Sequence, residues 1–260
     1  MKKVGWILTL VVILLIGAII TYNYLNKEEK SEIKEKKTTS AITTTKKKEK
    51  NEMDGITLNY HASIKMEKEG KVIYFDPFKI DNTSNDADYI FITHSHYDHY
   101  SETDIKKVMK DSTKFIITSD LEGKVSNLGV NKENITVVYP NESYTVDEIK
   151  FDTIPAYNTN KTYHKKSYNW VGYNVNLGGI KYYVVGDSDV TDEFKDVKCD
   201  VIFVPVGGTY TMDEKEASGA INEIKPKYAI PVHYGETGSG DNAKHFIELL
   251  NEEIKGVVLK

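Results

Sequence analysis

The sequence contains no arginine, so all 34 of its basic residues are lysines. A lysine ammonium group cannot clamp a carboxylate or phosphate with the paired, planar hydrogen bonds that a guanidinium group makes. An anionic substrate would therefore have to be held by a metal ion, by lysine or by backbone N–H groups. The formal net charge is -5, and the mixed charges lack the clustered positive field of nucleic-acid-binding proteins. We expect no nucleic-acid partner.

Cysteine is almost absent as well. The single residue, Cys199, excludes a disulfide framework, a cysteine-rich zinc site and a dithiol redox motif. Its position at the start of an apolar run is typical of a buried or half-buried structural thiol. Any metal site in this chain must therefore be built mainly from imidazole and carboxylate groups.

One long hydrophobic run occurs close to the N-terminus. No charged residue lies between Val4 and Tyr22, a length sufficient for a helix that crosses a bilayer. Lys2 and Lys3 ahead of the run would also suit a cleaved signal peptide. The run is long, however, and a small-residue cleavage site is poor. Residues 1–25 are therefore predicted to be an uncleaved, single-pass membrane anchor.

The segment that follows, residues 26–52, consists almost entirely of Lys, Glu, Thr, Ser and Asn. It is too polar to bury a core, so it is predicted to be a polar, disordered linker ahead of a domain at residues 53–260. A simple count of its lysines favours a cytoplasmic location for that domain. A very short N-terminal tail before a signal-anchor-like run favours the opposite orientation. We expect an extracytoplasmic domain at the cell membrane.

Beyond the linker, short β-rich runs alternate with helical patterns. Strands are predicted at residues 55–66, 71–75, 89–93, 114–118, 135–139, 148–154, 172–176, 181–185, 201–206, 228–232 and 256–259. Helices are predicted at residues 101–110, 121–128, 215–224 and 243–253. Many strands with helices between and after them indicate a layered α/β architecture in a single domain.

The strongest signal is the motif His94-Ser95-His96-Tyr97-Asp98-His99, which follows an apolar strand at residues 89–92. Imidazole and carboxylate groups are the ligands that borderline divalent cations prefer, and a loop at a strand end can aim several at one point. A lone histidine is usually structural, but that explanation fails for three within six residues. The motif therefore predicts a metal site.

Three other ligand-type residues follow apolar strands in the same manner: Asp76, Asp187 and His233. Sites in α/β sheets gather at the carboxyl ends of strands, so these side chains are expected to share one edge with the motif. His245 differs, because it lies within a predicted amphipathic helix and is expected at the surface.

Seven short motifs, taken in order, resemble the metallo-β-lactamase superfamily, in its branch of metal-dependent hydrolases related to ascorbate-6-phosphate lactonase. They are Tyr60-His61-Ala62, Phe75-Asp76-Pro77, the motif from His94 to His99, Pro155-Ala156-Tyr157-Asn158, Gly186-Asp187-Ser188, Pro205-Val206-Gly207-Gly208-Thr209-Tyr210 and Val232-His233-Tyr234-Gly235. The resemblance implies a four-layer αββα sandwich with one or two zinc ions at its edge, manganese or iron being alternatives. It says little about the substrate.

The resemblance also implies six metal ligands, in the order first metal, bridge and second metal: His94 and His96; Asp187; Asp98, His99 and His233. A hydroxide held between the metals would be the nucleophile, because two cations lower the pKa of bound water. Asp98 could also orient this hydroxide or carry its proton.

Several positions leave alternatives open. Asn158 stands where the family commonly has a third histidine for the first metal, and asparagine is a poor zinc ligand. His164, six residues on, could supply that imidazole or could be a surface residue of a lysine-rich loop. Asp76 is expected to fix the tautomer of a ligand histidine, or else to cap the bend at Pro77. His61 is expected near the mouth of the site as a substrate contact or proton donor, or as a structural residue.

Two functional hypotheses follow. The first is a membrane-anchored, zinc-dependent hydrolase of a small ester, lactone or phosphodiester, with N–H groups or the tyrosine hydroxyl of residues 207–211 facing a polarised oxygen. The second is a non-catalytic metal-binding or sensor module on a membrane stalk. The complete set of ligands for the second metal favours the enzyme, whose partner would be a small-molecule substrate. No motif indicates an oligomeric state.

Overall fold

The computed structural model describes residues 21–24, 26–27, 51–236 and 238–259. The chain divides into two units, Met1–Asn51 and Glu52–Lys260. Within the described ranges, no helix is both long and apolar enough to cross a membrane. The expected anchor and linker lie almost wholly outside these ranges, so both remain predictions.

The first sheet of the Glu52–Lys260 unit has six strands in chain order: β1 (Ile56–Tyr60), β2 (Ser63–Lys68), β3 (Lys71–Phe75), β4 (Tyr89–Phe91), β5 (Lys114–Thr118) and β6 (Ile135–Val138). The first three strands are antiparallel, and β3 to β6 run parallel. The run predicted as one strand at residues 55–66 is divided into β1 and β2. His61 causes the break, because its left-handed backbone (φ 53°) turns the chain between them.

The second sheet has seven strands, in chain order β7 (Ser143–Val146), β8 (Ile149–Pro155), β9 (Val171–Leu177), β10 (Ile180–Val184), β11 (Val201–Pro205), β12 (Tyr228–Val232) and β13 (Lys255–Gly256). These strands lie side by side in the reverse order, from β13 to β7. Antiparallel pairs join β7 to β10, and β10 to β13 run parallel. The sequence did not predict β7, because its half-exposed residues form only a weak apolar pattern.

Five α-helices are described in this unit: α2 (Glu102–Val108), α3 (Glu122–Ser126), α4 (Asp192–Lys195), α5 (Glu214–Ile224) and α6 (Gly240–Glu248). Three short 3-10 helices accompany them: η1 (Ser119–Leu121), η2 (Lys132–Asn134) and η3 (Lys166–Tyr168). Ser101, Asp213 and Ser239 cap α2, α5 and α6 by accepting hydrogen bonds from backbone N–H groups of the first turn. Only α4, a single turn, was not predicted.

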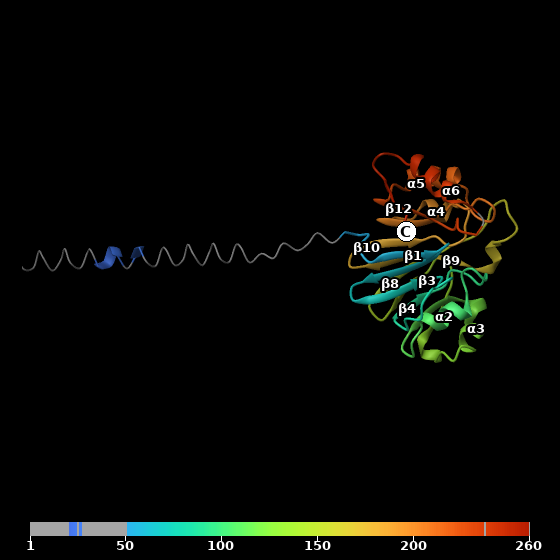
Figure 1. Ribbon diagram of the computed structural model, residues 1–260, viewed down its shortest axis with the longest axis horizontal. Helices are drawn as coiled ribbons and strands as arrows, with labels where there is room; N and C mark the ends of the chain where they lie inside the picture. Colours follow the sequence, from blue (N-terminus) through green and yellow to red (C-terminus); the bar gives the residue numbers. More distant parts are fainter. Residues whose placement is uncertain (1–20, 25, 28–50, 237, 260) are drawn as a thin grey trace, which may run out of the picture. The chain divides into compact units, whose positions relative to one another are not determined.

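The elements form four layers, with α2 and α3 on one side of the paired sheets and α4, α5 and α6 on the other (Figure 1). Phe91 and Tyr173 belong to the apolar layer between the sheets. Ile105 belongs to the layer under α2, whereas Ile221 and Phe246 belong to the layer under α5 and α6. All five side chains are fully buried, and burial of each stabilises the fold by roughly 1.5–3 kcal/mol. The predicted αββα sandwich is confirmed.

The parallel strands bring distant ligand-type residues to one edge. Asp76 follows β3, the motif from His94 to His99 follows β4, Asp187 follows β10 and His233 follows β12. Asp76 and His233 have left-handed backbones, with φ of 46° and 60°. Such conformations cost energy for residues other than glycine and concentrate at functional sites, because the surrounding structure must hold them.

Candidate metal centre

Four side chains form what we call the first ligand set: His94, His96, His164 and Asp187. One ligand atom from each lies within 4.8 Å of all the others. His96 Nδ1 is 3.1 Å from His94 Nε2 and 3.2 Å from His164 Nε2. The His164 ring is thus buried inside the set, 3.3 Å from Asp187 Oδ2, and not on the surface of its loop.

The second ligand set shares one carboxylate with the first and comprises Asp98, His99, Asp187 and His233. Asp187 Oδ1 lies 3.2 Å from His99 Nε2, and Asp187 Oδ2 lies 2.9 Å from His233 Nε2. Asp98 Oδ2 is 3.7 Å from His99 Nε2 and 3.6 Å from His233 Nε2. Asp187 therefore lies between the two sets, which is the position that a bridging ligand needs.

Hydrogen bonds behind the rings fix which nitrogens face the centre. His99 Nδ1 lies 2.7 Å from Asp76 Oδ2, and His94 Nδ1 lies 2.9 Å from Thr93 Oγ1. Thr93 donates its hydroxyl proton to Asp76, so its oxygen is free to accept from His94. Both histidines then carry a proton on Nδ1 and present the Nε2 lone pair to the centre. Asp76 has the tautomer-fixing geometry that was expected from the sequence.

His164 is oriented by an amide in place of a carboxylate. Asn158 Oδ1 is 2.9 Å from His164 Nδ1 and also accepts a hydrogen bond from the His164 backbone N–H. Asn158 Nδ2 donates in turn to Asp189 Oδ1 and to the Tyr210 carbonyl, which keeps the amide oxygen turned toward His164. The asparagine that stands in place of a histidine thus supports the histidine six residues further on.

Trp170 and Asp189 were not singled out from the sequence. The Trp170 ring centroid is 4.8 Å from the ring centroids of both His94 and His96, and its Nε1 donates to Asp120 Oδ2. It forms an apolar wall behind the first ligand set. A single tryptophan or aspartate carries no spacing signal, so only the folded chain shows these roles.

His61 lies beneath Asp98 and is buried. Its Nδ1 accepts hydrogen bonds from the backbone N–H groups of Gly235 and Glu236, so the neutral ring carries its proton on Nε2. That nitrogen faces Asp98 Oδ2 at 3.3 Å and has no lone pair to offer a metal in this tautomer. Packing of the β1–β2 turn against the loop after β12 covers the ring, so His61 lies buried beside Asp98 and not at an open mouth of the site. Its expected role as a proton donor stays a prediction.

The charge states of the two sets differ. Burial lowers the pKa of His94 and His96, so these rings are neutral at physiological pH. Burial alone would also lower the pKa of His233, but the contact with Asp187 outweighs it and raises the pKa to about 9. The pKa of His99 is raised as well, chiefly by Asp187 and Asp76 against the effect of burial. A cation entering the second ligand set would displace protons.

The donor set fits divalent cations. Buried polar atoms are nearly always hydrogen bonded, yet the close contacts of His99 Nε2, His233 Nε2 and Asp187 Oδ1 lack hydrogen-bond geometry among the described residues. All three face the centre. Imidazole nitrogens and carboxylates converging in this way satisfy one another only through a shared cation or proton, and they are the ligands of zinc and related metals.

A cavity of about 350 Å³ opens directly onto the centre. Its lining includes ligands of both sets and four other residues: Tyr97, Tyr163, Tyr210 and Glu236. Of the glycine-containing loop at residues 207–211, only Tyr210 lines this cavity. The Gly208 N–H is already bonded to the Met212 carbonyl, so this N–H group does not serve as a donor to substrate.

The fold and the centre define a class of protein, and comparison with known sequences agrees. Residues 55–233 match the β-lactamase superfamily domain, and the chain belongs to this superfamily. A UPF0173 metal-dependent hydrolase of Pyrococcus furiosus is 30% identical over 79% of this chain and 96% of its own. Another from Carboxydothermus hydrogenoformans is 30% identical over 69% of this chain and 84% of its own.

Solved structures agree with this assignment. A candidate metal-dependent hydrolase from Parabacteroides distasonis is 30% identical and superposes with a TM-score of 0.65, over 78% of this chain and 91% of its own. A candidate zinc-dependent hydrolase from Thermotoga maritima is 26% identical and superposes with a TM-score of 0.52, over 78% of this chain and 96% of its own. The chain is therefore a metal-dependent hydrolase of the metallo-β-lactamase superfamily, as the sequence predicted. The lactonase-related branch remains a prediction.

Proposed function

We propose that this protein is a zinc-dependent hydrolase of a small ester, lactone or phosphodiester. The observation that carries the proposal is the pair of ligand sets joined through Asp187, which open onto one cavity. Each set supplies nitrogen and oxygen donors only, a combination that suits zinc. The description of the Thermotoga maritima relative as zinc-dependent supports the same choice.

In this proposal the first ligand set holds one ion and the second holds the other. When bound, such ions lower the pKa of a water molecule and polarise the bond to be cleaved. The protein supplies their placement, because Thr93, Asp76 and Asn158 hold the ligand histidines in the required tautomers. Positions fixed in this way need no rearrangement as the reaction proceeds.

Asp98 is the proposed catalytic carboxylate. It lines the cavity, and contacts with His233 and His61 hold its pKa well below the usual value against the effect of burial. The carboxylate is therefore ionised, and it can orient a reacting water molecule beside the substrate by accepting a hydrogen bond from it. His61 acts as a positioning residue, since its Nε2 proton faces Asp98 and its Nδ1 is fixed by backbone N–H groups.

Metal analysis combined with a substrate screen tests this function. We expect the purified full-length chain to contain up to two equivalents of zinc and to hydrolyse an ester or lactone. Removal of the metal by a chelator should abolish turnover, and zinc should restore it. Metal binding without turnover of any ester, lactone or phosphodiester would favour the non-catalytic metal-binding module. Preferential activation by manganese or iron would contradict the assignment of zinc.

We also propose that residues 1–25 anchor the protein in the cell membrane with the catalytic domain outside the cytoplasm. The carbonyl of Glu52 accepts a hydrogen bond from Tyr182, and its carboxylate pairs with Lys227, just before β12. His233 follows the other end of that five-residue strand, about 17 Å away at roughly 3.3 Å per residue. Glu52, the first residue of this unit, thus lies near the end of β12 opposite the centre.

The orientation is testable by proteolysis. Protease added to intact protoplasts is expected to remove the catalytic domain, because the polar segment at residues 26–52 would be outside. Immunoblotting with an antibody against the domain would follow the loss. Complete protection before lysis, with digestion only afterwards, would place the domain in the cytoplasm.

A further inference from the structure

The wall of the cavity beyond the ligand sets is aromatic. Tyr163 and Tyr210 meet edge to face, with ring centroids 4.6 Å apart and an interplanar angle of 88°. Tyr97, which also lines the cavity, packs edge to face against Phe78, with ring centroids 6.0 Å apart. Rings that hold one another in these preferred geometries form a preorganised apolar surface. A substrate reaching the centre therefore passes aromatic side chains from the loops that follow β4, β8 and β11.

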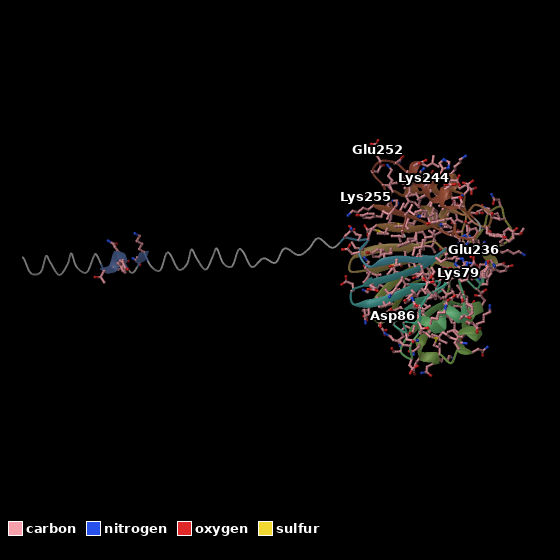
Figure 2. The ribbon with its side chains drawn as sticks, in the orientation of Figure 1. Lys79, Asp86, Glu236, Lys244, Glu252 and Lys255 are labelled. Atoms are coloured by element: carbon pink, nitrogen blue, oxygen red, sulfur yellow. The ribbon has the colours of Figure 1, made fainter. Side chains whose placement is uncertain are left out.

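The only charged lining residue outside the two ligand sets is Glu236, counting the residues that the structure describes. It forms an ion pair with Lys79, and the two side chains lie close together at the surface (Figure 2). The Lys79 ammonium group also lies 4.1 Å from the centroid of the Tyr60 ring. Lys79 and Glu236 therefore neutralise each other, and Lys79, held by this pair and by the Tyr60 ring, is not free to bind an anion.

A second lysine near the first ligand set is occupied as well. Lys161 Nζ lies 2.6 Å from Asp189 Oδ1, an oxygen that also accepts a hydrogen bond from Asn158 Nδ2. No lysine lines the cavity within the described residues, and the chain has no arginine to replace it. A charged phosphate or carboxylate on the remote part of a substrate would meet three phenol rings and the carboxylate of Glu236. Phenol hydroxyl groups could donate hydrogen bonds to that anion, but no free cation on the described wall would offset the loss of its hydration.

We propose that the cavity selects an uncharged ester or lactone whose acyl or alcohol part carries an apolar ring. Tyr163 and Tyr210 bind the ring, and the absence of a free cation on the described wall disfavours anionic substrates, including phosphodiesters. This inference rests on the proposed hydrolase function and narrows its substrate class. Hydrolysis adds one water molecule across the acyl C–O bond and gives an acid and an alcohol, so no other reactant is required. The carboxylate product finds no free cation on the described wall, which assists its release.

The charge requirement can be tested with substrates of matched shape. We expect the zinc-loaded, full-length chain to hydrolyse phenyl acetate with a kcat/KM at least about tenfold above that for anionic 4-acetoxybenzoate. Bis(4-nitrophenyl) phosphate should be a poorer substrate still. Glu236→Gln should reduce the preference for phenyl acetate several-fold, because it frees the Lys79 ammonium group to bind the anionic ester. Glu148→Gln, which breaks an exposed pair with Lys71, is the control.

The aromatic requirement is tested separately. Tyr163→Ala and Tyr210→Ala should each raise KM for phenyl acetate several-fold with little change in kcat, whereas Tyr210→Phe should retain the parent KM. Tyr139→Ala, at an exposed tyrosine that does not line the cavity, should leave both constants unchanged.

The results that would contradict the substrate class differ from those that would contradict the hydrolase function. Equal or better turnover of the anionic ester or the phosphodiester would overturn the inference while leaving the hydrolase function intact. An unchanged KM for phenyl acetate in both Tyr163→Ala and Tyr210→Ala would also overturn the inference and leave the hydrolase function intact. Failure to hydrolyse any ester, lactone or phosphodiester would overturn the proposed function, and the inference with it.

Discussion

The two ligand sets use the same kinds of side chain, yet two histidines of the first set and two of the second have pKa values shifted in opposite directions in the absence of metal. His94 and His96 of the first set have a lowered pKa, and His99 and His233 of the second have a raised one. Burial is similar for His94, His99 and His233, which are all at most 1% exposed. Burial therefore does not explain the difference.

The number of neighbouring carboxylates explains the opposite pKa shifts. Asp187 contacts both sets, but Asp76 bonds His99, and Asp98 lies near His99 and His233. In the first set, the partners behind the rings are a hydroxyl and an amide, which orient a histidine without adding charge. Neighbouring charge thus decides the protonation of equally buried rings. More carboxylates surround the second ligand set than the first. Removing one of them therefore changes the charge of the site as well as the geometry of its ligands.

The largest effect is expected where the two sets meet. Asp187→Asn should remove the shared carboxylate and reduce metal content at both sets to near zero. Metal content after dialysis, measured by plasma mass spectrometry, checks this, with exposed Asp196→Asn as the control. A variant that retained two tightly bound ions would show that the sets do not depend on a bridge.

The next largest effect is expected at Asp98, which is both a member of the second ligand set and the proposed catalytic carboxylate. Asp98→Ala should abolish hydrolysis, because it removes the carboxylate beside the cavity, while the first ligand set and the fold stay intact. Steady-state kinetics and circular dichroism measure the two properties. Turnover of a good substrate at the parent rate by the metal-loaded variant would contradict the proposed role.

The first ligand set can be weakened alone. His164→Ala should lower metal affinity by about one to two orders of magnitude, because a buried imidazole 3.2 Å from His96 Nδ1 is lost. Competition with a chromogenic chelator measures this affinity. His245→Ala is the control, since that ring is half exposed and contacts only Glu214 among the interactions described. Equal affinity in the His164 variant and the parent would exclude this residue as a ligand.

The smallest effect concerns the amide behind His164. Asn158→Ala should weaken the first metal by about tenfold, the lower end of the range for groups that orient a ligand. Asp189→Asn should weaken it less, because the Tyr210 carbonyl still accepts from the Asn158 amide. Neither variant should alter the affinity of the second ion. An equal loss at both ions would indicate general destabilisation in place of a positioning role.

Much of the fold follows from local patterns. Continuous apolar runs such as β11, fully buried on both faces, are recognisable without a structure, and helices α2 and α5 start at their capping residues. Weakly patterned β7 and single-turn α4 escaped prediction because their stability comes from neighbours in the fold. The centre shows the same difference between local pattern and folded context. Its ligand residues can be recognised in the sequence, whereas the groups that orient these ligands cannot.

The sequence by itself determined the superfamily, the layered architecture and the residue types at the centre, because a strand followed by His-x-His-x-Asp-His is a local pattern. Only the tertiary structure decided that His164 turns inward on Asn158, that His61 is buried beneath Asp98, and that Lys79 is neutralised by Glu236. The physical reason is separation along the chain. Glu236 follows Lys79 by 157 positions, so packing of the two sheets sets such contacts, and no local spacing encodes them.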